Sequence, residues 1–112
     1  METKVSALLA EVPDLPGHEV QRLLEAATGL TRAGTLRDPV VDATQVARFR
    51  DVVARRRGGE PLQYIEGLAH FGPLLLGIDR RALIPRPETE RLWELAIESI
   101  TEVENPIVVD LC

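Results

Sequence analysis

The sequence is short of cysteine, of basic residues and of long apolar runs, and each shortage excludes a class of protein. The single cysteine, Cys112, leaves no internal disulfide and is compatible with a reducing compartment. Lys and Arg number 13 against 18 acidic residues, and the net charge of −5 argues against general affinity for nucleic acid or anionic membranes. No apolar run approaches the ~20 residues that span a bilayer, and the N-terminus lacks a secretory signal. These features predict a cytoplasmic protein with no membrane partner and no direct nucleic acid partner.

Within the first sixty residues, apolar side chains recur at the spacing of amphipathic helices. Three stripes follow this pattern: Val5, Leu8, Leu9 and Val12; Val20, Leu23, Leu24 and Ala27; and Val46, Phe49 and Val53. A stripe of this kind is stable only when a neighbour covers it. The sequence therefore predicts a mainly α fold that begins with a small helical bundle.

Turn and cap residues mark where these helices begin and end. Gly29 is placed to cap the second helix, and the pair Asp42 and Gln45 is a variant of the capping box that starts the third. Gly58 and Gly59 stop that third helix. Residues 30–41 are ambiguous, because the apolar positions within them allow a short helix before a proline: Leu30, Ala33 and Leu36.

After Gly59 the pattern changes from long helices to short elements. Pro61 suits the first position of a short helix, and residues 70–78 form two apolar runs around a Gly-Pro turn, which predicts a β-hairpin. Pro87 is placed to start another helix, with acidic residues favourable in its first turn. The run IVVDL (107–111) reads as a buried parallel strand. Since such a strand needs neighbours and a crossover, we expect the sequence to be incomplete at its C-terminus.

One basic cluster stands out in this acidic chain. Residues 48–58 hold five arginines against one aspartate, a local net charge of +4. Arg55, Arg56 and Arg57 form either a solvated helix end or a docking patch for an acidic partner. His18 reads as a solvated or capping residue, and no residues show the spacing of a metal site or of a nucleophile with its base.

Three segments together resemble the release-factor glutamine methyltransferases, the PrmC or HemK family. The matching strings are GEPLQYIEG (59–67), the hairpin that begins at Phe71, and LIPRPETE (83–90), with weaker agreement in RLLEAATG (22–29) and VVDLC (108–112). The resemblance spans most of the chain. Two positions depart from the family pattern: Gly77 in the second hairpin strand, where glycine weakens a strand, and Trp93 on the following helix.

The resemblance implies three parts with separate roles. Residues 1–67 would be a helical domain that recognises the protein substrate, residues 68–82 a connecting hairpin, and residues 83–112 the truncated start of a Rossmann-like α/β methyltransferase domain. The family transfers a methyl group from S-adenosylmethionine to the amide nitrogen of the Gly-Gly-Gln glutamine in class I peptide release factors. By resemblance, Pro87, Glu88 and Thr89 line the cofactor pocket, and Asp110 is the strand-end acid beside the cofactor loop. Arg55, Arg56 and Arg57 lie in the domain that the resemblance assigns to protein recognition, so we expect them to contact the substrate protein.

The family motifs that bind the cofactor and hold the amide lie beyond Cys112. We therefore expect this chain alone to be inactive and not to bind S-adenosylmethionine. Two alternatives remain open: a stand-alone helical module that binds a protein, and a related methyltransferase acting on another NH₂ group such as that of adenine. Apolar residues in the C-terminal segment also lead us to expect self-association through that surface.

Overall fold

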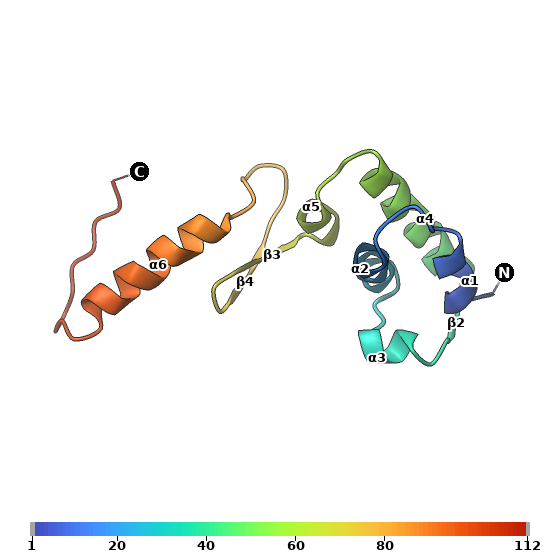
Figure 1. Ribbon diagram of the computed structural model, residues 1–112, viewed down its shortest axis with the longest axis horizontal. Coiled ribbons are helices and arrows are strands. Elements are labelled where there is room, and N and C mark those ends of the chain that lie inside the picture. Colours follow the sequence, from blue (N-terminus) through green and yellow to red (C-terminus); the bar gives the residue numbers. More distant parts are fainter. Residues whose placement is uncertain (1, 112) are drawn as a thin grey trace. The chain divides into compact units, whose positions relative to one another are not determined.

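A computed structural model describes residues 2–111, and its contacts divide the chain into two compact units, Met1–Gly67 (unit 1) and Leu68–Cys112 (unit 2). The helices are α1 (Val5–Ala10), α2 (Gly17–Thr28), α3 (Arg32–Thr35), α4 (Ala43–Arg57), α5 (Leu62–Glu66) and α6 (Pro87–Ile100) (Figure 1). The strands form two antiparallel pairs: β1 (Thr3–Lys4) with β2 (Val40–Val41), and β3 (Leu68–Phe71) with β4 (Leu74–Gly77). The fold is therefore mainly helical, as the sequence predicts. Among residues 2–111, no helix has the length and apolar character needed to cross a membrane.

The ends of the helices follow the local signals in the sequence. Gly29 ends α2 with a φ of 75°, a left-handed conformation that favours glycine. At the start of α4, the Asp42 carboxylate accepts the Gln45 backbone N–H at 2.8 Å, and the Gln45 side chain accepts the Asp42 N–H at 3.0 Å. The predicted capping box is confirmed. The Gln45 amide also donates to the carbonyl of Thr28, which ties the start of α4 to the end of α2.

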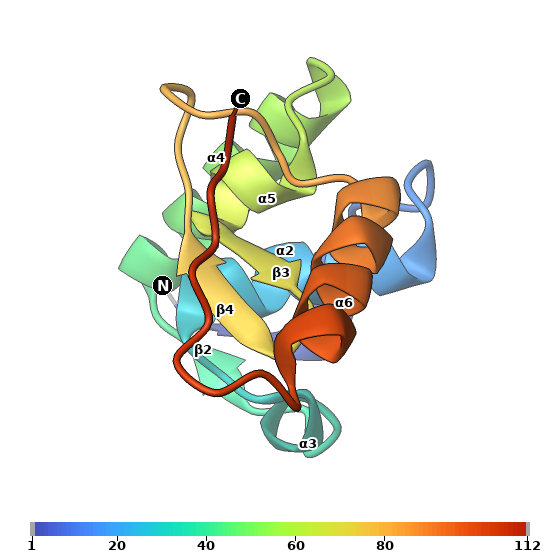
Figure 2. The same ribbon diagram turned by 90° about the vertical axis from the view of Figure 1, so that its left-hand side faces the viewer.

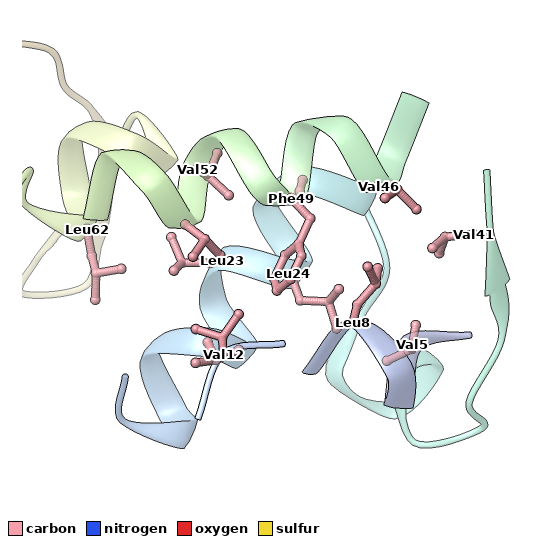
Figure 3. Packing of buried hydrophobic residues seen from close by; sticks show 13 residues of the cluster. Val5, Leu8, Val12, Leu23, Leu24, Val41, Val46, Phe49, Val52 and Leu62 are labelled. Atoms are coloured by element: carbon pink, nitrogen blue, oxygen red, sulfur yellow. The ribbon is translucent and has the colours of Figure 1, made fainter. Parts of the chain in front are cut away.

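The hydrophobic core lies in unit 1, where α2 packs against α4. Its largest fully buried side chains come from three helices: Val5 and Leu8 on α1, Leu23 and Leu24 on α2, and Phe49 on α4. Figure 3 shows Phe49 pointing toward Leu24 and Leu8. All three predicted stripes face this core, although α1 ends at Ala10 and buried Val12 follows it in the chain. Leu62 of α5 completes the cluster.

The pairing of β1 with β2 was not foreseen from the sequence. The strands are two residues long, with Thr3 opposite Val41, and the N–H of Val5 donates to the carbonyl of Pro39. Beside them the Asp38 carboxylate accepts both the N–H and the hydroxyl of Ser6, at 2.7 and 3.0 Å. A residue distant in sequence therefore caps the first turn of α1, whose own N-cap side chain makes no such bond.

The short helix that residues 30–41 allowed is present as α3, and of the three apolar positions that suggested it only Leu30 packs against the core. Leu30 is half-buried, whereas Ala33 is exposed and Leu36 is 80% exposed. The side chain that is buried instead is Thr35, whose hydroxyl donates to the carbonyl of Arg32 and accepts from the amide of Gln21. A hydrogen-bonded threonine therefore anchors α3 to α2, and Leu36 is left in solvent.

Unit 2 consists of the predicted hairpin followed by α6 (Figure 2). The hairpin begins at Leu68, the first residue of the expected connecting segment 68–82 and two residues before the apolar runs at 70–78, and Phe71 pairs with Leu74 across the Gly-Pro turn. α6 starts at Pro87 as predicted and buries none of its side chains. The strand expected at residues 107–111 is not formed, and that prediction was wrong for the structure of this chain. A strand requires a partner, and no described segment pairs with this one.

We predict that a chain ending at Gly67 retains the cooperative fold of unit 1, whereas a chain ending at Gly59 is less stable. The shorter chain loses the burial of Leu62, worth about 1.5–3 kcal/mol, and the carboxylate of Glu66 that accepts from Arg22. Circular dichroism during thermal unfolding measures the difference. Equal melting temperatures for the two chains would show that α5 contributes nothing to the bundle.

Candidate functional site

The basic cluster predicted as a docking patch lies in the last turn of α4, and carboxylates from other segments surround it. Arg55, Arg56 and Arg57 each donate two side-chain hydrogen bonds to one carboxylate at 2.6–3.1 Å. Arg50, earlier on α4, does the same at 2.8 and 3.0 Å. We call these four pairs the ion-pair belt: Arg50 with Glu11, Arg55 with Glu60, Arg56 with Glu19, and Arg57 with Asp14.

The ion-pair belt joins α4 to three other stretches of unit 1. Glu11 follows α1, Asp14 precedes α2, and Glu19 lies in the first turn of α2. Two-point guanidinium–carboxylate pairs fix orientation as well as charge. An exposed pair contributes little stability by itself, so the belt acts mainly by holding the connection between α1 and α2 against α4.

The ion-pair belt reduces the positive charge that the sequence indicates for residues 48–58. The hydrogen bond from Arg56 lowers the pKa of Glu19, and those from Arg57 and Arg50 lower the pKa of Asp14 and of Glu11. These carboxylates are therefore ionised near neutral pH, and each cancels the charge of one arginine. The local +4 of residues 48–58 is offset by carboxylates that lie elsewhere in the sequence. The docking role of Arg55, Arg56 and Arg57 stays a prediction.

The residues predicted to border a cofactor pocket lie in unit 2. Pro87 is the first residue of α6, Glu88 and Thr89 belong to its first turn, and Asp110 lies in the segment after the helix. Arg86 before the helix is extended, with φ −100° and ψ 149°, as expected for a residue that precedes proline. The structure thus brings three of the four residues together at one helix end.

These residues do not form a cofactor site by themselves. A nucleoside cofactor with a reactive sulfonium is held in an enclosed, largely apolar cavity, whereas Pro87, Glu88, Thr89 and Asp110 are all exposed. The side chains present therefore do not enclose S-adenosylmethionine in this chain. The expected absence of cofactor binding stays a prediction.

A contact not foreseen from the sequence joins the hairpin to α6. The rings of Phe71 and Trp93 meet edge to face, with centroids 6.1 Å apart and planes at 67°. The turn residue Gly72, which follows Phe71 in the chain, has a φ of +54°, and an added Cβ there would stand 3.1 Å from the indole of Trp93. Trp93, noted above as a departure from the family pattern, is therefore the residue that packs α6 against the turn.

Unit 1 also carries a shallow hollow between α2 and the α3 region. Its volume is about 460 Å³. Five residues of α2 and two from the α3 region line it: Gly17, His18, Gln21, Arg22, Glu25, Arg32 and Leu36. His18 is exposed in the first turn of α2, as expected for a solvated histidine. Sequence periodicity could not reveal this hollow, because it depends on Leu36 facing solvent.

The chain is similar to known proteins along most of its length. The family model of the PrmC N-terminal domain matches residues 3–67. Curated relatives named release factor glutamine methyltransferase include those of Deinococcus radiodurans, 39% identical over 91% of this chain, and Burkholderia pseudomallei, 37% identical over 95%. The relative of that name from Streptomyces coelicolor is 45% identical over 65% of this chain. The matches cover only 37%, 38% and 27% of those relatives, so the chain spans well under half of their length.

We predict that Gly72→Ala loosens the contact between Phe71 and Trp93, because the new methyl group meets the indole at a strained backbone position. Trp93 is the only tryptophan, so its fluorescence reports this contact directly and should shift to longer wavelength. Gly77→Ala is the matched control, since an added Cβ there has no neighbour within 4 Å. The same emission from both variants would contradict the prediction.

The ion-pair belt predicts a specific dependence of stability on pH. Folding lowers the pKa of Asp14 and of Glu19, so the stabilisation is present above their ordinary values near 4 and is lost as pH falls through the lowered values. The variant Asp14→Asn/Glu19→Gln should melt a few degrees below the parent chain at pH 7. This difference should narrow as the pH falls towards about 2, because the parent carboxylates then take up protons and lose their charge as well. A difference in melting temperature of equal size at both pH values would show that these carboxylates do not stabilise the fold through their charge.

Proposed function

The chain belongs to the PrmC N-terminal domain family, and from this membership we propose that it is the substrate-recognition part of a protein-glutamine methyltransferase. In a protein of the relatives' full length, the methyl group of S-adenosylmethionine would pass to the amide nitrogen of the Gly-Gly-Gln glutamine in class I peptide release factors. The observation that carries the proposal is the agreement between the family match, residues 3–67, and the compact unit Met1–Gly67. The names of the curated relatives support the reaction and the substrate.

The chemistry explains why such an enzyme would have a separate recognition unit. The lone pair of an amide nitrogen is delocalised into the carbonyl group, so the nitrogen is a poor nucleophile. The amide must be held in line with the methyl donor, and orientation of this kind can supply about 7–11 kcal/mol of the barrier. A unit that grips the substrate protein outside the reacting loop provides binding energy for that alignment.

We assign the parts of the chain accordingly. Residues 1–67 would hold the release factor, residues 68–82 would connect, and residues 83–112 would begin a Rossmann-like domain. There Pro87, Glu88, Thr89 and Asp110 would contribute one edge of the cofactor pocket, which residues of the longer protein would have to enclose. The exposed positions of these four side chains are compatible with covering by a further domain.

Binding of a class I release factor to this chain tests both the recognition role and the arginines. We predict that replacing Arg55, Arg56 and Arg57 with Ser weakens binding, since exposed charges steer association. The control variant Asp14→Asn/Glu19→Gln/Glu60→Gln breaks the same three ion pairs but keeps the arginines. If the arginines dock, only the Ser variant loses affinity at low salt. If both variants and the parent chain bind the release factor with equal affinity, the arginines do not dock the partner and have only a structural role.

The exposed apolar side chains of unit 2 support the proposal of self-association. Those exposed by more than half include Leu75, Leu83, Leu92, Val108 and Leu111. Large exposed apolar patches recruit partners, and a second copy offers the same surface. We predict an apparent mass that rises with concentration in light scattering. A constant monomer mass into the hundreds of micromolar would contradict this.

A further inference from the structure

The arginines of unit 1 divide into two groups by their partners. Five donate to carboxylates: the four of the ion-pair belt and Arg22, which donates to Glu66. Among the described residues, Arg32, Arg37 and Arg48 have no carboxylate within ion-pair distance, and all three are exposed. Arg32 and Arg37 lie outside the basic cluster of residues 48–58, and Arg48 is the one arginine of that cluster that has no carboxylate partner among the described residues.

Two of these three arginines flank one exposed leucine. Arg32 opens α3, and Leu36 and Arg37 follow its end. Leu36 is 80% exposed, and among residues 2–67 the other exposed large hydrophobic side chain is Val40, at 52%. An isolated exposed leucine is ordinary on a protein surface. A leucine that lies between uncompensated cations and also lines a hollow matches the apolar centre and polar rim of an interface.

The walls of the hollow are held in place before any partner arrives. The Gln21 amide donates to the Thr35 hydroxyl at 2.9 Å, which fixes α3 against α2. The Arg22 guanidinium is half-buried and donates from Nε to Glu66 at 3.2 Å. Side chains that are already ordered lose little conformational entropy on binding, so contacts made here yield more net affinity.

We propose that Arg32, Leu36 and Arg37, with the adjoining hollow, form a docking surface for an acidic segment of a protein partner. An apolar side chain of that segment covers Leu36, while its carboxylates pair with Arg32 and Arg37. The proposal rests on the function proposed above, and it adds a second contact to the release factor, separate from the ion-pair belt. It commits to a protein because Leu36, 80% exposed and flanked in sequence by the two arginines, offers an apolar contact that a polypeptide segment can use and a phosphate backbone cannot.

The test compares two charge-matched variants of the 112-residue chain in binding a class I release factor. Arg32→Gln/Leu36→Ser should weaken binding by about tenfold or more, as expected for an interface centre. Arg48→Gln removes another exposed arginine without a carboxylate partner, on α4, and should bind as the parent chain does. Because all three side chains are exposed, circular dichroism should show the same helical content throughout.

Each outcome separates this surface from the proposed function. If the parent chain binds the release factor and Arg32→Gln/Leu36→Ser binds equally well, the docking surface is wrong and the proposed function stands. If the parent chain does not bind the release factor at all, the recognition role fails and this surface fails with it. A 20-nucleotide single-stranded RNA serves as a second probe. If the parent chain binds this RNA and the Arg32→Gln/Leu36→Ser variant does not, the surface binds nucleic acid and the proposed protein partner is wrong.

Discussion

The packing of α2 against α4 is the contact on which the rest of unit 1 depends. Leu23 and Leu24 meet Phe49 with no solvent exposure, and α1, β2 and α5 add their apolar side chains to the same cluster. Because the stabilisation from the hydrophobic effect is roughly proportional to the apolar surface area that is buried, this cluster supplies most of the free energy that stabilises the fold of unit 1. Unit 2 has no comparable cluster, since Ala69 is its only buried hydrophobic among the described residues.

The packing of the core also determines which arginines of unit 1 lie close to a carboxylate and which do not. With α2 held against α4, acidic residues near the start of α2 come within reach of the arginines at the end of α4, across 37 and 43 residues of sequence. The conspicuous basic run is thereby compensated within the unit. Among the described residues of unit 1, the exposed arginines without such partners are Arg48 on α4 and Arg32 and Arg37 around α3. A protein-recognition role for unit 1 is thus compatible with the net charge of −5 of the whole chain.

Local signals in the sequence predict most of the fold but little of the candidate site. Helical periodicity, Gly29, the Asp42–Gln45 box and Pro87 act within a few residues, so the sequence alone predicts the main helices and their caps. The two-residue strands β1 and β2, the partners of the arginines and the exposure of Leu36 depend on contacts between distant residues. The expected strand at residues 107–111 shows the same limit, because apolar composition predicts a strand only when a partner strand is available.

The central claim is that unit 1 recognises a protein and does so through its helical surface. The most direct measurement is nuclear magnetic resonance of the isotope-labelled chain during titration with a class I peptide release factor. The account predicts that shifted amide resonances fall within residues 2–67, with the largest changes around α3 and the facing side of α2. Shifts confined to residues 68–111, or none at a saturating concentration of the release factor, would contradict it.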